Sequence, residues 1–160
     1  MRFLLIDKIV ACDPETGITG LKNVTMSEDF LRDHFPGFPV MPGVLQIEAS
    51  AQLAGWLMFA RSNGTQYGCL STIQAAKFRE FIVPGSQLQI TYTLTAAEEA
   101  QLTGNVSIAV DGTIKTEIKR LRVAAVPVES LMDPGQAQLY CDFISGRLPR
   151  GGYASQGAAL

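Results

Sequence analysis

Glu48 is a carboxylate within residues 43–59, a segment whose other residues are almost all apolar. Burying an unpaired carboxylate costs several kcal/mol, so this group must be paired, hydrogen-bonded or protonated. Gln52 follows one helical turn later and could hold the carboxylate by a hydrogen bond. A satisfied polar pair inside the core, with no part in chemistry, is the alternative explanation.

Gly43 stands at the start of the same segment, directly after Pro42. The first amides of a helix have no partner within it and lie at the positive end of its dipole. A carbonyl oxygen placed there would be polarised, as in an oxyanion hole, and a glycine lets a ligand come close to the backbone. A plain Pro-Gly turn remains the alternative.

His34 is the only histidine, and its ordinary pKa of about 6.5 suits proton transfer at neutral pH. A lone histidine can equally be a surface or packing residue. However, a base, a buried acid and a helix N-terminus all fall within residues 34–52, in a segment stiffened by three prolines. Together they could remove a β-hydroxyl next to a carbonyl, because this elimination needs a base, an acid and stabilisation of an enolate-like charge.

Residues 34–52 (HFPGFPVMPGVLQIEASAQ) closely resemble the signature of the 3-hydroxyacyl-[acyl-carrier-protein] dehydratases of the FabZ type. Similarity extends over about residues 2–126, including segments 2–7, 21–25, 77–79 and 83–88. The resemblance implies a hotdog fold, in which a curved antiparallel sheet wraps a long central helix. It also implies a tight homodimer, of a kind that in this family is commonly joined into larger assemblies, with His34 of one subunit facing Glu48 of the other.

The implied substrate is a 3-hydroxyacyl thioester on the phosphopantetheine arm of acyl carrier protein, with no metal or cofactor. His34 would take the α-proton, Glu48 would assist departure of the hydroxyl, Gly43 would bind the thioester carbonyl and Gln52 would support Glu48. Four basic residues could dock the acidic carrier, although a merely solvated face explains them equally well: Lys77, Arg79, Arg120 and Arg122.

The leading hypothesis is therefore a dehydratase that forms a trans-2-enoyl thioester in fatty-acid or related secondary-metabolite biosynthesis. Glutamate at position 48, where the related dehydratase-isomerases carry aspartate, argues against isomerisation. Two alternatives stay open, a hotdog acyl thioesterase and a non-catalytic acyl-carrier binding partner. Gln74 and Ala75 depart from the polar, usually charged pair of the family near the acyl tunnel, so chain-length preference stays undetermined.

The segments around the motif predict an α+β fold. Residues 43–59 are expected to form one buried helix, because their apolar residues leave no solvent face. Alternating polar and apolar residues predict strands at 88–94, 102–110 and 114–126, the last with a phase slip near 119–121 that suggests a bulge. Residues 69–83 are expected to be extended and to end at the Pro84-Gly85 turn.

The N-terminal part is expected to form a hairpin of residues 3–12 and 18–25 around a turn at 13–17. A short helix is expected to open at Ser27, and the prolines at 36, 39 and 42 predict an extended, rigid stretch. The hotdog domain would cover residues 1–127. Residues 128–160 are a C-terminal extension, with a helix at about 133–145 capped by Asp133-Pro134 and a Gly/Ala/Ser-rich tail expected to be mobile.

Composition narrows the class of protein. The 160 residues are 47% hydrophobic and 18% charged, with a net charge of -2, which argues against disorder and against nucleic-acid binding. The low charged fraction suggests self-association. Cys12, Cys69 and Cys141 lack metal-site spacing and are expected to be reduced, buried thiols, as in the cytoplasm. No secretory signal is expected, and the longest uncharged helical stretch, residues 49–60, is too short for a bilayer, so a soluble protein is expected.

Overall fold

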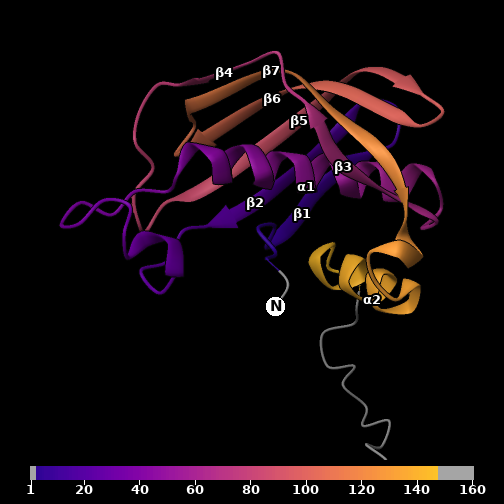
Figure 1. Ribbon diagram of the computed structural model, residues 1–160, viewed down its shortest axis with the longest axis horizontal. Helices are drawn as coiled ribbons and strands as arrows, with labels where there is room; N and C mark the ends of the chain where they lie inside the picture. Colours follow the sequence, from indigo (N-terminus) through magenta and orange to yellow (C-terminus); the bar gives the residue numbers. More distant parts are fainter. Residues whose placement is uncertain (1–2, 148–160) are drawn as a thin grey trace, which may run out of the picture.

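The computed structural model of the protein describes residues 3–147. Seven strands form one antiparallel sheet in the order β1-β2-β5-β6-β7-β3, with β4 also paired to β7. The sheet curls over the central helix α1, as Figure 1 shows. The elements are β1 Lys8–Asp13, β2 Gly17–Asn23, the 3-10 turn η1 Asp29–Leu31, α1 Gly43–Arg61, β3 Gln66–Thr72, β4 Ala75–Phe78, β5 Gln87–Glu98, β6 Gln101–Val110, β7 Thr113–Pro127, the 3-10 turn η2 Val128–Ser130 and α2 Pro134–Ile144. The expected α+β hotdog architecture is thus confirmed.

Helix α1 is buried along most of its length, as its apolar sequence predicts. It contacts β2, β3, β5, β6 and β7, and its residues from Ala49 to Phe59 contribute much of the core. Val44 is an exception to the expectation that no side chain faces solvent, since it is 70% exposed in the single chain. It lies in the first turn of the helix.

The strand predictions hold where the period of two is clear. β5, β6 and β7 form a meander, and the slip predicted near 119–121 is a bulge: Gly104 pairs with Leu121 but Val106 pairs with Ile118. Arg120 sits in this bulge with a φ of 49°, and its amide donates to Asn105 Oδ1 at 3.0 Å. The bulge lies where β7 changes partner from β4 to β3. The expected extended segment 69–83 is therefore two strands, β3 and β4, and residues 79–83 lie outside them.

The chain before α1 differs from its prediction in three ways. The expected hairpin forms, but its first strand begins only at Lys8, and residues 3–7 belong to no strand. The helix expected from Ser27 is only the single 3-10 turn η1; Glu28 occupies the N-cap position and Ser27 Oγ instead lies 3.0 Å from Thr25 Oγ1. The proline stretch is not extended throughout, because Phe35 and Phe38 exchange backbone hydrogen bonds of 3.1 and 2.9 Å across a tight turn. Gly37 has the positive φ of 79° that this turn requires.

The C-terminal helix forms as predicted. Asp133 Oδ1 accepts from the Gln136 amide at 2.8 Å, and Pro134 is the first helical residue. α2 is not separate from the core, since its buried residues Ala137, Cys141 and Ile144 belong to the same hydrophobic cluster as α1. The tail expected to be mobile lies, from residue 148 onward, outside the described residues.

All three cysteines are free thiols, but Cys12 is exposed, so the expectation that all three are buried is wrong. Its strand β1 is an edge of the sheet, where side chains have fewer neighbours. No helix within residues 3–147 is both long and apolar enough to cross a membrane.

Candidate active site

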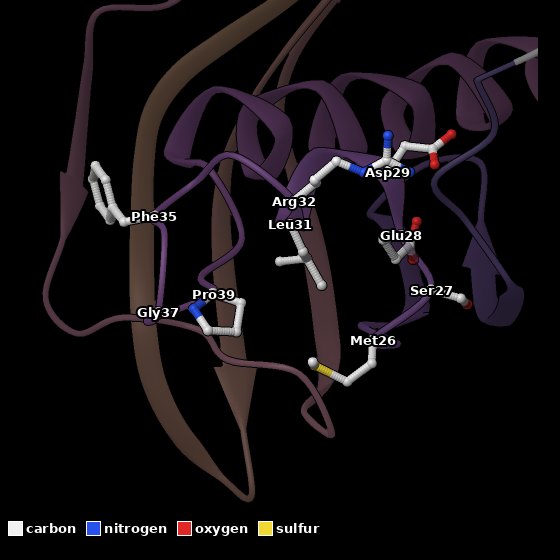
Figure 2. A pocket seen from close by; sticks show the side chains of 9 residues that line it. All are labelled: Met26, Ser27, Glu28, Asp29, Leu31, Arg32, Phe35, Gly37 and Pro39. Atoms are coloured by element: carbon white, nitrogen blue, oxygen red, sulfur yellow. The ribbon is translucent and has the colours of Figure 1, made fainter.

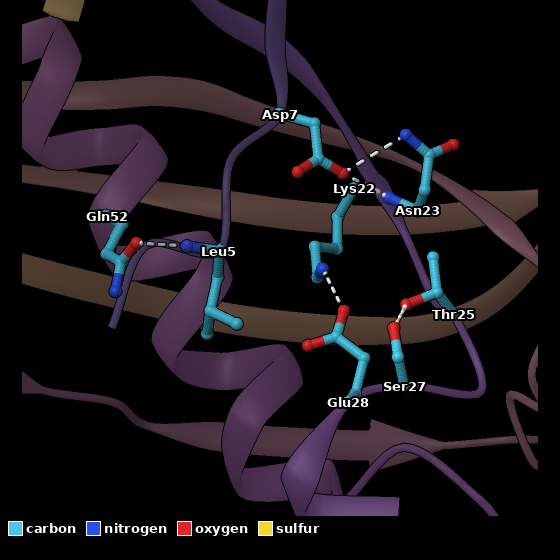
Figure 3. Close-up of polar contacts among 8 residues, drawn as sticks. All are labelled: Leu5, Asp7, Lys22, Asn23, Thr25, Ser27, Glu28 and Gln52. Atoms are coloured by element: carbon cyan, nitrogen blue, oxygen red, sulfur yellow. Dashed lines mark hydrogen bonds and ion pairs between the residues drawn. The ribbon is translucent and has the colours of Figure 1, made fainter. Parts of the chain in front are cut away.

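Glu48 is held by Gln52, as the spacing of the two residues on α1 predicts. Gln52 Nε2 donates to Glu48 Oε1 at 2.9 Å. The Gln52 side chain is itself fixed from the N-terminal segment, because its Oε1 accepts from the Leu5 amide at 2.9 Å and its Nε2 also donates to the Phe3 carbonyl at 2.9 Å. Figure 3 shows the bond between Leu5 and Gln52. These contacts leave the amide little freedom, so it fixes the orientation of the partly buried Glu48 carboxyl.

Two groups of strand β3 lie near the Glu48 carboxylate. Burial, reinforced by the charge of Glu48, raises the pKa of the Cys69 thiol above its usual value. Burial also raises the pKa of Tyr67, with smaller contributions from Cys69 and Glu48. The Tyr67 hydroxyl donates to the Gln52 carbonyl at 3.0 Å. Both groups therefore stay protonated at neutral pH, and Glu48 faces neutral neighbours on this side.

The N-terminus of α1 presents backbone amides as expected. The Pro42 carbonyl accepts from the Leu45 and Gln46 amides at 3.0 and 3.2 Å, which leaves the Gly43 amide ahead of the first intrahelical bonds. The Phe78 ring lies against Gly43 so closely that an added Cβ would come within 2.8 Å of Phe78 Cζ. Only glycine fits here without movement of the ring.

Gln46 is a positioning residue that the sequence pattern did not single out. Its buried side chain accepts from Thr116 Oγ1 at 2.6 Å and donates to the Met41 carbonyl at 3.3 Å. These bonds tie the first turn of α1 to β7 and to the incoming chain. The available signal was the same one that pointed to Glu48, a polar residue in an otherwise apolar helix.

His34 lies half-buried in the loop before α1. Its carbonyl accepts from the Val40 amide at 2.8 Å, and its imidazole stacks on Phe35 with ring centroids 4.3 Å apart. Beside this loop is an open cleft of about 500 Å³, shown in Figure 2 and lined by Met26, Ser27, Glu28, Asp29, Leu31, Arg32, Phe35, Gly37 and Pro39. Within the described part of one chain, no hydrogen bond, ion pair or ring contact joins His34 to Glu48.

The four basic residues expected to dock a carrier lie on or beside β4 and β7. Lys77 and Arg120 are exposed, whereas Arg79 forms an ion pair with Glu117 and Arg122 Nε donates to Thr103 Oγ1 at 3.3 Å. Arg79 is thus partly neutralised. Among the described side chains, no group of three or more His, Cys, Asp or Glu residues is arranged to hold a metal ion.

Comparison with known proteins identifies the family of the chain. Residues 1–119 match the model of the FabA-like domain. The chain belongs to this family. It is 44% identical over 118 residues to the 3-hydroxyacyl-[acyl-carrier-protein] dehydratase FabZ of Polynucleobacter necessarius, covering 72% of this chain and 76% of the relative. It is 38% identical over 116 residues to the FabZ dehydratase of Bacillus pumilus, covering 72% and 81% respectively.

The fold of this family is shared with proteins of other chemistry. A Pseudomonas aeruginosa thioesterase, PA1618 in its Q49A mutant form, superimposes with a TM-score of 0.58 at 16% identity, covering 74% of this chain and 80% of its own. At this identity the likeness shows the hotdog fold alone. The residues of the site, rather than the fold, must therefore distinguish a dehydratase from a thioesterase.

Proposed function

We propose that the protein removes water from a 3-hydroxyacyl thioester carried on acyl carrier protein and releases the trans-2-enoyl thioester, in fatty-acid or related acyl-chain biosynthesis. The observation that carries the proposal is the Glu48 carboxyl held by Gln52 on α1, five residues beyond the Gly43 amide, which precedes the first intrahelical bonds. Relatives named as this dehydratase, 38% and 44% identical, support it.

Each residue has one step in this elimination. His34 takes the proton from the α-carbon, and the electron pair left behind forms the double bond to the β-carbon. The bond between the β-carbon and the hydroxyl oxygen breaks, and the hydroxyl leaves as water with a proton from Glu48. The Gly43 amide donates to the thioester oxygen, on which charge develops. Gln52 acts through Glu48, whose orientation it fixes.

The complete site forms between two copies of the chain. An elimination needs its acid and base within reach of the same substrate, yet in the described part of one chain no hydrogen bond, ion pair or ring contact joins His34 to Glu48. Apolar side chains around the site are exposed in the single chain, as expected of a surface that a partner covers. They are Phe35, Phe38, Val44, Phe78 and Phe81. A homodimer in which His34 of one subunit faces Glu48 of the other satisfies both observations.

The proposal includes no resident metal or cofactor, because His34, Glu48 and the α1 amide supply every proton transfer and the charge stabilisation. The phosphopantetheine arm of the carrier brings the substrate. Exposed Lys77 and Arg120, with Arg79 and Arg122, would meet the acidic surface of the carrier. We place this reaction in the cytoplasm.

The activity is tested with a 3-hydroxyacyl-pantetheine thioester, by following the absorbance of the conjugated enoyl product. His34→Ala and Glu48→Gln should each lower kcat by about 10²-fold or more, whereas the control Glu99→Gln, in an exposed turn, should leave it unchanged. Equal turnover in all four proteins would refute the assignment. Release of free thiol instead of enoyl product would indicate a thioesterase, and carrier binding without turnover would indicate a non-catalytic partner.

The shared site has its own test. When the two inactive variants are mixed and their subunits exchanged, half of the dimers contain one copy of each. One site of such a dimer carries both substitutions and the other carries neither. About a quarter of the wild-type activity should return. No recovery after confirmed exchange would place both residues of a site in one chain.

A further inference from the structure

Lys22 is the only charged residue that is buried in the part of the chain that the structure describes. In β2 the buried positions alternate, and Lys22 follows Ile18 and Gly20 on the buried face, which at Gly20 lies against Leu53 of α1. Only 6% of its side chain is exposed. A buried ammonium without a partner is costly, so the role of this residue depends on what it meets.

Its partner is Glu28, in the loop that leads to His34. Lys22 Nζ lies 2.5 Å from Glu28 Oε1, and 20% of the Glu28 side chain is exposed. Figure 3 shows this ion pair spanning from β2 to the loop. A buried ion pair contributes little net stability compared with an apolar pair of similar size. The defined direction and length of the Lys22–Glu28 ion pair, however, hold β2 and the loop before His34 in one relative position.

The β2 side of the pair is rigid. Next to Lys22, the Asn23 amide donates to Asp7 Oδ2 at 2.5 Å, and its side chain accepts from Gln87 Nε2 at 2.8 Å. Lys22 itself lies opposite Leu88 in the β2–β5 ladder. The Lys22 ammonium is therefore a fixed point of the sheet.

The loop side of the pair has other supports as well, since Val24 is buried and its amide donates to the Ser86 carbonyl at 2.9 Å, and Phe30 packs against the core. Between β2 and His34 the only regular structure is the 3-10 turn η1. Glu28 begins this turn, because its carbonyl accepts a hydrogen bond from the Leu31 amide at 3.0 Å. Leu31 is the buried apolar residue of this turn. Glu28 and Leu31 are thus two of the anchors of the loop, and His34 follows Leu31 by three residues. Both anchors line the cleft of Figure 2, whose wall also includes Phe35, the ring on which His34 stacks.

We propose that the Lys22–Glu28 ion pair is a positioning device for the catalytic loop, which sets the place of His34 relative to the substrate without touching the substrate itself. The proposal rests on the proposed function of His34 as the base. Because a displacement of about 1 Å can lower a rate by up to about 10²-fold, the loss of a fixed anchor should appear in kcat more than in KM.

The test compares three variants with the intact protein. Glu28→Gln removes the charge while keeping the size of the side chain. Lys22→Met/Glu28→Met replaces the whole pair by an apolar one, which should fold with a Tm close to that of the parent, as replaced buried ion pairs often do. Glu15→Gln is the matched control, because it removes the charge of an exposed residue that pairs with Arg61 at the C-terminal end of α1, the end opposite to Gly43.

Two readouts distinguish positioning from a merely structural role. The first is the split between kcat and KM for a 3-hydroxyacyl-pantetheine thioester: the Met/Met variant should lose about tenfold in kcat with KM nearly unchanged. The second is the NMR resonance of the imidazole Cε1–H in protein without a histidine tag, which is a single signal because His34 is the only histidine. This signal should move or broaden in Glu28→Gln and in the Met/Met variant, and stay in place in Glu15→Gln.

A Met/Met variant with parental kcat and an unmoved resonance would overturn the proposal, and so would a fall in Tm with kcat unchanged. If Glu28→Gln does not fold, the Met/Met variant decides alone. If the intact protein shows no dehydratase activity, the proposed function fails; the histidine resonance then still decides whether the ion pair positions His34.

Discussion

Replacing Gln52 by leucine should lower both stability and activity, through two different hydrogen-bond partners. In the Gln52→Leu variant the buried Leu5 amide loses its acceptor, and an unsatisfied buried donor costs about 1–3 kcal/mol. The Phe3 carbonyl belongs to an exposed residue and can bond to water instead, so it adds little. The expected loss in free energy of unfolding is therefore about 1–3 kcal/mol.

The activity should fall because Glu48 loses the donor that orients it. Glu48 becomes charged as it gives its proton to the leaving hydroxyl, and a hydrogen bond to a charged group contributes about 1.5–3 kcal/mol. The partial exposure of Glu48 favours the lower end of this range. Since each 1.36 kcal/mol is a factor of ten in rate, kcat should fall about tenfold or somewhat more. KM should change less, because Gln52 does not touch the substrate.

Both quantities can be measured on the same sample. Urea unfolding is followed by the fluorescence of Trp56, the only tryptophan, which is buried in the core. Turnover is followed by enoyl absorbance. The matched control is Gln138→Leu. Gln138 lies on the exposed face of α2, and its Nε2 donates to the carboxylate of Asp142, four residues further on, at 2.9 Å. This substitution should change stability by at most about 0.5 kcal/mol and leave kcat unchanged. A Gln52→Leu protein as stable and as active as this control would refute the reasoning.

Three further predictions concern the helix start and the buried tyrosine. Gly43→Ala places a Cβ 2.8 Å from the Phe78 ring, so kcat should fall, and adding Phe78→Leu should restore part of it; equal kcat in all three proteins would contradict the tight fit. Thr116→Val removes the hydrogen bond of 2.6 Å that Thr116 Oγ1 donates to Gln46 Oε1, so the free energy of unfolding in urea should fall by about 1–3 kcal/mol. Burial raises the pKa of the Tyr67 phenol above its usual value of 10.0, so the folded protein keeps a proton that the unfolded chain releases. Stability should therefore be intact below pH 10 and fall as the pH rises beyond it; urea midpoints that do not fall between pH 9 and pH 11 would contradict this.

Where a local pattern determines the structure, the sequence was sufficient to predict it. The apolar run of α1 predicted a buried helix, because such a segment has no face that favours water. Asp133 and Pro134 predicted the start of α2, and the phase slip near Arg120 predicted the bulge in β7. The pairing of Glu48 with Gln52 was also predictable, since the two residues are one turn apart on one helix.

Features that depend on distant partners were not predictable in this way. Prolines restrict φ at their own positions but do not fix the direction of the chain between them, so the turn from Phe35 to Phe38 interrupts the expected extended stretch. Ser27 has the residue type of a helix cap but bonds to Thr25 instead. The exposure of Cys12 follows from the place of β1 at the edge of the sheet, which the order of strands alone decides.

The sequence by itself thus determined which residues are chemically able to act and which helix carries the acid, because residue type and helical spacing are local properties. Tertiary structure decided what holds them. Gln46 meets Thr116 across 70 residues, and Gln52 meets Leu5 across 47. Lys22 meets Glu28 only because β2 turns that position toward the interior. Contacts of this kind depend on how the sheet curls around α1, and no spacing along the chain encodes them.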